Sequence, residues 1–172
     1  MDEARIQDGV PVTAGWFVIN AGRARWLHND MRSVCRFGGE GPAHFDHLGI
    51  SLYSIDPGKP MSLYHHEAGQ EDFLVLAGTA TLILEDTERP LETWDFVHCP
   101  PRTAHTIVAT GDRPVLILAV GARREKGSAR YPVQARAAAL GAGVPDAATG
   151  PDEVYARSGP PRPGPAPNLP AA

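Results

Sequence analysis

The feature of this sequence that most limits its fold is a run of short apolar segments between Gly49 and Arg123. The segments are rich in Val, Ile, Leu, Phe and Thr, and clusters of Gly, Pro and Asp interrupt them at intervals of about ten residues. No helical periodicity breaks the series. Such spacing is typical of an all-β sandwich or jelly-roll barrel rather than a parallel α/β sheet. Strands are expected at 50–55, 61–67, 72–76, 79–85, 94–99, 105–109 and 115–120.

Segments on both sides of this core predict smaller elements. Residues 15–20 and 33–37 are expected to be strands. Short helices are expected at 132–140, which is Ala-rich and stops at Gly141, and more weakly at 152–157. The predicted division is N-terminal strands and loops that pack on the barrel or a partner subunit at 1–48, one barrel domain at 49–123, a C-terminal extension with a short helix at 124–158, and a Pro-rich tail, disordered or extended, at 159–172.

Composition and charge exclude several classes of function. Acidic residues outnumber basic ones by 20 to 16, which gives a formal net charge of −4, and no basic stripe could follow a phosphate backbone. No apolar run approaches the roughly 18 residues of a membrane helix, and the N-terminus lacks a signal-peptide pattern. We therefore expect a cytoplasmic protein that binds neither nucleic acid nor membranes.

Cys35 and Cys99 are expected to be small buried residues that do not form a disulfide.

The residues with the clearest chemistry lie between positions 58 and 78, just before a predicted strand and a Gly turn. They are His65, His66, Glu67 and Glu71. Imidazole nitrogens and carboxylate oxygens are ligands that suit divalent Mn, Fe, Ni and Zn. The segment therefore predicts a metal site without thiolate ligands.

Side-chain direction along the predicted strand 61–67 helps to choose among these residues. Positions i and i+2 of a strand face the same side. The apolar residues of the strand thus direct His65 and Glu67 inward and His66 toward solvent or a second layer. A β-bulge in this strand would reverse the choice.

A further candidate ligand, His105, follows a Pro-Pro turn and begins the next predicted strand. If the strands pair as antiparallel neighbours, His105 enters the barrel near the first cluster. Taken alone, it is better described as a partly buried, hydrogen-bonded histidine than as a ligand. His98 is a candidate general base or supporting residue if its strand face lines the barrel, and otherwise a half-buried polar contact. Trp94 and Phe96, on the same strand, are expected to pack.

The first cluster resembles the first motif of the cupin superfamily, G-x5-H-x-H-x3/4-E-x6-G. His65-x-Glu67-x3-Glu71-x6-Gly78 matches it with Glu67 in place of the second histidine, while Gly58 lies one residue too far upstream. A second register aligns His66 with the second histidine and puts a tyrosine where the first belongs. The first register is preferred because a carboxylate binds metal more readily than a phenol and because the strand direction agrees.

The second segment resembles the second cupin motif, G-x5-P-x-G-x2-H-x3-N. Pro100-x-Arg102-x2-His105 matches it, with Trp94 and Arg102 replacing glycines and Ala109 replacing the asparagine. The resemblance covers roughly residues 49–121, less than half of the chain. It implies a double-stranded β-helix with an open mouth.

The resemblance also implies one divalent metal ion (Mn, Fe, Zn or Ni), held by His65, Glu67, Glu71 and His105. A carboxylate in place of an imidazole adds a negative charge, which weakens the Lewis acidity of the ion and favours Mn or Fe. A cupin whose metal site has decayed into a binding pocket is the alternative, because a fold does not guarantee its chemistry. His66 in place of Glu67 remains the other choice of fourth ligand.

The functional prediction is a metal-binding cupin, expected to be a metal-dependent enzyme for a small polar organic molecule, of the dioxygenase, isomerase or decarboxylase type. A non-catalytic metabolite-binding domain and a structural domain are the alternatives, and no catalytic residue is assigned. The small molecule is expected in the barrel mouth.

Both faces of the strand 72–76 are apolar, so one face must be covered by the N-terminal strands or by a second subunit. A homodimer is therefore expected.

Overall fold

The predicted all-β fold is confirmed, with 40% of residues in strands and 9% in helices. The structure is a computed structural model that describes residues 2–123, 129–148, 150–156 and 158–169. Its barrel strands are β5 (Leu48–Ile55), β6 (Glu71–Ala77), β7 (Ala80–Leu84), β8 (Thr87–Leu91), β9 (Phe96–Cys99), β10 (His105–Ala109) and β11 (Val115–Ala122). The flanking elements are β1 (Ile6–Gln7), β2 (Val10–Pro11), β3 (Trp26–His28), β4 (Ser33–Arg36), β12 (Arg162–Gly164), α1 (Ala135–Ala139) and α2 (Pro151–Tyr155).

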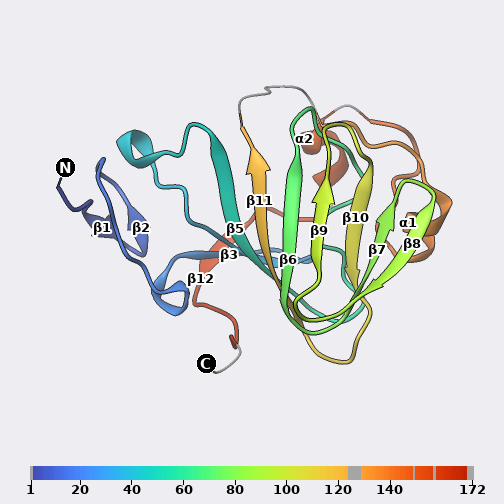
Figure 1. The fold of residues 1–172 in the computed structure, drawn as a ribbon, viewed down its shortest axis with the longest axis horizontal. Helices are drawn as coiled ribbons and strands as arrows, with labels where there is room; N and C mark the ends of the chain where they lie inside the picture. Colours follow the sequence, from blue (N-terminus) through green and yellow to red (C-terminus); the bar gives the residue numbers. More distant parts are fainter. Residues whose placement is uncertain (1, 124–128, 149, 157, 170–172) are drawn as a thin grey trace.

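Two antiparallel sheets enclose the main core. One has the order β12-β3-β4-β5-β11-β6-β9 and the other the order β10-β7-β8. Alternate residues of the facing strands are fully buried between them, including Val75, Ile107 and Ile117. This alternation is the period of two that the apolar segments predicted. Figure 1 shows that the start of β6, the start of β10 and α2 lie at the same end of the barrel.

The outer face of the large sheet has a cover from within the chain. Leu76, Leu116 and Leu118 pack with the fully buried Trp26 of β3. The tail after position 159, expected to be disordered or extended, contributes to this cover: β12 pairs with β3, and Leu169 packs against the same cluster. Residues 162–164 are thus extended, because a segment too Pro-rich to build a core still adds to the edge of an existing sheet.

The segment 61–67, expected to be a strand, forms only isolated bridges, including His65 with His105. Other groups satisfy its backbone. The side chain of Arg32 donates to the carbonyl of Met61, Thr106 Oγ1 donates to the carbonyl of Ser62 at 2.6 Å, and the amide of Leu63 donates to Tyr155 Oη at 3.0 Å. Met61, Ser62, Tyr64 and His65 are all buried. The two-sided alternation assumed from the sequence is therefore absent here.

Other local predictions were also wrong. Strand β8, at the edge of the small sheet, was not among the expected strands, because its TERPL sequence is polar and contains a proline. An edge strand tolerates both features. Residues 15–20 form no strand beyond the bridge of Trp16 to Glu3. Trp94 and Phe96 do not pack: they are 72% and 65% exposed on the outer side of the barrel. Helices occur near the two expected places but are shorter, and Arg157 lies outside the described residues.

No helix among the described residues is long and apolar enough to span a membrane. Cys35 and Cys99 are both free and buried, as expected from the sequence.

Candidate metal centre

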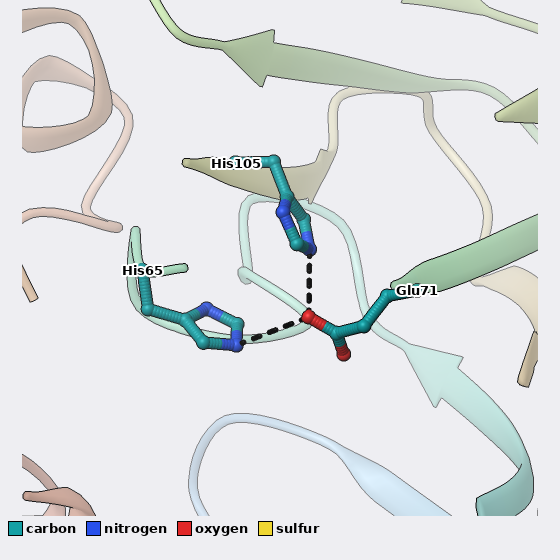
Figure 2. A group of neighbouring side chains, drawn as sticks. All are labelled: His65, Glu71 and His105. Atoms are coloured by element: carbon teal, nitrogen blue, oxygen red, sulfur yellow. Dashed lines mark ion pairs between the residues drawn. The ribbon is translucent and has the colours of Figure 1, made fainter. Parts of the chain in front are cut away.

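Three side chains from separate parts of the chain converge at the α2 end of the barrel (Figure 2). One ligand atom from each of His65, Glu71 and His105 lies within 4.8 Å of the other two. Glu71 Oε2 is 3.8 Å from His65 Nε2 and 3.5 Å from His105 Nε2. Glu71 begins β6 and His105 begins β10, while His65 lies in the segment before β6.

The backbone aligns the two histidines. The amide of His65 donates to the carbonyl of His105 at 3.1 Å, and the amide of His105 donates back at 2.8 Å. This reciprocal pair brings the two imidazole centroids to 5.2 Å. The two rings are therefore placed by the main chain and not by side-chain packing alone.

Each imidazole is held in a form suited to metal binding. Nδ1 of His65 donates to the carbonyl of Leu63 at 2.9 Å, and Nδ1 of His105 donates to the carbonyl of Thr103 at 3.0 Å. Because a carbonyl can only accept, the ring hydrogen of each neutral histidine is on Nδ1. The lone pair of each Nε2 then points toward Glu71, as in metal-binding histidines whose second nitrogen is hydrogen-bonded.

The atoms that face one another lack other partners. Glu71 Oε2 and His105 Nε2 are buried and make no hydrogen bond within the described residues. Unpaired buried polar atoms are costly and need an explanation. A divalent cation bound to both would provide it, and two imidazoles with a carboxylate are a donor set that suits Mn, Fe, Ni or Zn. The residues present therefore fit the metal that a cupin implies.

Burial sets the charges of the site. It lowers the pKa of His65 to about 3, with a further contribution from His105, and it also lowers the pKa of His105. Burial, followed by the negative charge of Glu67, raises the pKa of Glu71 to about 8. Both histidines are thus neutral near pH 7, the state in which they bind metals, while Glu71 needs a nearby cation to ionise fully.

The two candidates for a fourth ligand lie beside this group and not within it. Glu67 Oε1 is 3.8 Å from His65 Nε2, and its side chain is 43% exposed. His66 is half-buried, and its backbone pairs with Arg130 in both directions at 3.0 Å. Neither residue belongs to the group whose ligand atoms lie within 4.8 Å of one another.

Two other sets of histidines are outside the site. Val97 and Cys99 face the core, so His98 points outward, where its Nδ1 lies 2.6 Å from Asp72 Oδ1. The strand face of His98 therefore does not line the barrel, which was the condition for a general base, and His98 makes a polar contact instead. His44 and His47 are exposed in the loop before β5.

Residues far from the motifs surround the site and were not predicted. The ring of Tyr131 stacks on His65, with centroids 5.5 Å apart, and Tyr155 meets Tyr131 edge-on at 5.9 Å. Both tyrosines belong to the C-terminal extension. Their only signal in the sequence is that they are isolated aromatic residues in an otherwise Gly-, Pro- and Ala-rich segment.

Comparisons with known proteins agree with this fold and these motifs. Residues 51–121 match the cupin domain family. A sugar phosphate isomerase of the cupin superfamily from Silicibacter pomeroyi is similar, with 29% identity, a TM-score of 0.50, and coverage of 59% of this chain and 65% of its own. A cupin-like protein from Thermotoga maritima has 18% identity and a TM-score of 0.51, with coverage of 60% of this chain and 77% of its own.

Residues 51–121 therefore match a cupin domain, and the resemblance seen in the motifs is confirmed. No curated protein matches the chain. The chain spans 65% of the length of the isomerase from Silicibacter pomeroyi, which is less than two thirds.

Substitution of the ligands tests the metal centre. His105→Ala and Glu71→Ala are each expected to abolish stoichiometric metal in protein purified without a His tag, because each removes an unpartnered donor atom. His66→Ala should leave the metal content nearly unchanged. Elemental analysis measures all three, with the outward-facing His98→Ala as a matched control. Full metal content in both ligand variants would contradict the assignment, and a large loss in His66→Ala would select His66 as the fourth ligand.

Metal uptake should also release protons in a pH-dependent way. With a pKa of about 8, Glu71 is mostly protonated at pH 7, so Mn²⁺ binding to metal-free protein should displace about one proton. The release should fall toward zero above pH 9, where Glu71 is already ionised, and the neutral histidines should contribute none. Titration calorimetry in buffers of different ionisation enthalpy measures it. Equal release at pH 7 and pH 9.5, or unchanged release in Glu71→Gln, would contradict the role of Glu71.

Proposed function

We propose that the protein is a metal-dependent enzyme that acts on a small polar organic molecule bound in the mouth of the cupin barrel. The observation that carries this proposal is the convergence of His65 Nε2, Glu71 Oε2 and His105 Nε2, two of them buried without a hydrogen-bond partner, at one end of the barrel. Polar atoms buried in a purely structural core are almost always hydrogen-bonded. A metal ion gives them partners and a chemical role.

In this proposal His65, Glu67, Glu71 and His105 together bind one divalent ion. Glu67 completes the set because its carboxylate lies as close to His65 Nε2 as that of Glu71, 3.8 Å in each case, and is partly open to solvent. Two carboxylates and two neutral imidazoles balance the charge of a dication, which favours Mn or Fe. When bound, the metal supplies a Lewis acid that polarises an oxygen of the substrate. Tyr131, stacked on His65, excludes water from that side of the site.

Among the three reaction types expected from the sequence, isomerisation receives the most support. The isomerase from Silicibacter pomeroyi is 29% identical over 59% of this chain, with a TM-score of 0.50. Dioxygenation and decarboxylation would use the same donor set, and they are alternative outcomes of the assay below.

Turnover after metal exchange tests the proposal. Metal-free protein reloaded with Mn²⁺, Fe²⁺ (without oxygen), Zn²⁺ or Ni²⁺ is incubated with aldose and ketose phosphates and with hydroxy and keto acids, and the products are followed by NMR. We expect turnover with at least one metal and a loss of roughly a hundredfold or more in His105→Ala. The outward-facing His98→Ala should keep full activity. Metal binding that only raises the unfolding temperature, with no turnover of any compound, would instead support a binding or structural domain.

We also propose that the protein is a homodimer. Within the chain, β3 and the tail cover Leu76, but Trp94 and Phe96 stay exposed on and beside the edge strand β9, with Phe96 opposite Leu74 of β6. Exposed aromatic pairs at a sheet edge are typical of interfaces. Sedimentation equilibrium should give the mass of a dimer, and Phe96→Ser should shift it toward monomer, while Val133→Ser, at an exposed position of the extension, should not. A monomeric wild-type protein at micromolar concentration would contradict the proposal.

A further inference from the structure

A second polar group lies beside the metal centre and has no role in binding the metal. Its central residue is Arg32, in the turn between β3 and β4. The guanidinium carbon lies 5.4 Å from the ring centroid of Tyr53 on β5 and 5.5 Å from that of Tyr155 on α2. The guanidinium also donates to the carbonyl of Met61. Three separate segments thus hold one cation in a fixed position.

Short contacts connect this group to the metal ligands. Tyr155 accepts a hydrogen bond from the amide of Leu63 at 3.0 Å, and the carbonyl of the same Leu63 accepts from His65 Nδ1. Tyr155 also meets Tyr131 edge-on, and Tyr131 stacks on His65. Arg32 and the proposed metal ligand His65 therefore both contact the backbone of residues 61–63. They are also connected through two touching rings, because Arg32 lies over Tyr155 and His65 stacks on Tyr131.

The charges of both groups also affect the pKa of Tyr53. Burial raises the pKa of Tyr53, the positive charges of Arg32 and Arg36 lower it, and the negative charge of Glu71 raises it again. The charge of Arg32 and the charge of Glu71, a proposed metal ligand, thus both act on Tyr53.

Arg32 keeps unused hydrogen-bonding capacity. Within the part of the chain that the structure describes, no carboxylate pairs with it. A guanidinium has five N–H donors, and the carbonyl of Met61 accounts for only one contact. The hydroxyl of Tyr53 likewise makes no hydrogen bond to any described residue. A half-buried arginine whose plane is held by aromatic rings presents its edge in a fixed direction, the arrangement that recognises planar or tetrahedral oxyanions.

We propose that Arg32 and Tyr53 bind the terminal oxyanion, a carboxylate or phosphate, of the substrate whose reacting oxygens lie at the metal. This inference rests on the proposed function and narrows its substrate class to small acids or phosphate esters. Arg32 supplies the positive charge, and Tyr53 donates one hydrogen bond. The rings of Tyr53 and Tyr155 limit the rotation of the guanidinium, so the substrate is oriented as well as attracted. Arg32 is in this respect a specificity-determining residue.

Anion binding by the Mn²⁺-loaded protein tests the inference, with inorganic phosphate and succinate as separate probes in titration calorimetry. The anion that binds more tightly identifies the kind of oxyanion that the site prefers. We expect Arg32→Gln to weaken its binding by roughly tenfold or more, Arg32→Lys to weaken it less, and Tyr53→Phe to weaken it by about threefold to tenfold. Arg113→Gln, at an exposed position in the turn between β10 and β11, is the matched control and should bind like wild type.

The metal content of every variant, measured alongside, separates this inference from the proposed function. Full metal content with weakened anion binding in the Arg32 and Tyr53 variants supports it. Wild-type affinity in both Arg32→Lys and Tyr53→Phe, or the absence of binding of either anion by folded, metal-loaded protein, overturns it. If wild-type protein takes up no metal, the proposed function fails. The same anion titrations on metal-free protein then still decide whether Arg32 binds an oxyanion. Arg32→Lys and Tyr53→Phe serve as the test if Arg32→Gln does not fold.

Discussion

The reciprocal pair of backbone hydrogen bonds between His65 and His105 is the interaction on which the rest of the site depends. It joins the segment before β6 to the start of β10, and β6 and β10 belong to different sheets. Because the hydrogen bonds are between main-chain atoms, the distance between the imidazoles does not depend on the flexibility of long side chains. The side chain of Glu71, at the start of β6, then faces both Nε2 atoms.

The same segment shows how the protein departs from regular structure to build the site. Between the two bridges of residues 60 and 65 to β10, one backbone hydrogen bond joins Met61 to Ile107 of β10. Side chains of Arg32, Thr106 and Tyr155 satisfy other backbone groups of this stretch. Side chains from the turn after β3 and from α2 thereby become part of the surroundings of the metal centre. The extension at the C-terminal end thus helps to form the site as well as to cover it. Irregular backbone with full hydrogen bonding is a common basis of functional sites.

Much of the fold could be predicted from the sequence, because alternation of apolar residues and Gly or Pro turns report directly on a two-layer β structure. The cupin motifs also indicated which histidines and carboxylates to consider, and the structure brings three of the four proposed ligands together. The reasoning from strand direction was less reliable. It directed His65 inward because side chains of a regular strand alternate between two faces. The segment does not alternate, since the adjacent residues Tyr64 and His65 are both buried. Arg32, Tyr53, Tyr131 and Tyr155 could not be predicted, because their roles depend on long-range contacts that leave no local pattern.

The central claim is that the chain binds one metal ion through the Nε2 atoms of His65 and His105 and the carboxylate of Glu71. Pulsed electron paramagnetic resonance of the Mn²⁺-loaded protein measures this most directly, because it counts the histidine nitrogens coupled to the metal. The account predicts two directly bound imidazole nitrogens in the wild type and one in His105→Ala loaded at excess Mn²⁺. Three bound imidazoles would place His66 in the site, and none would contradict the metal centre itself.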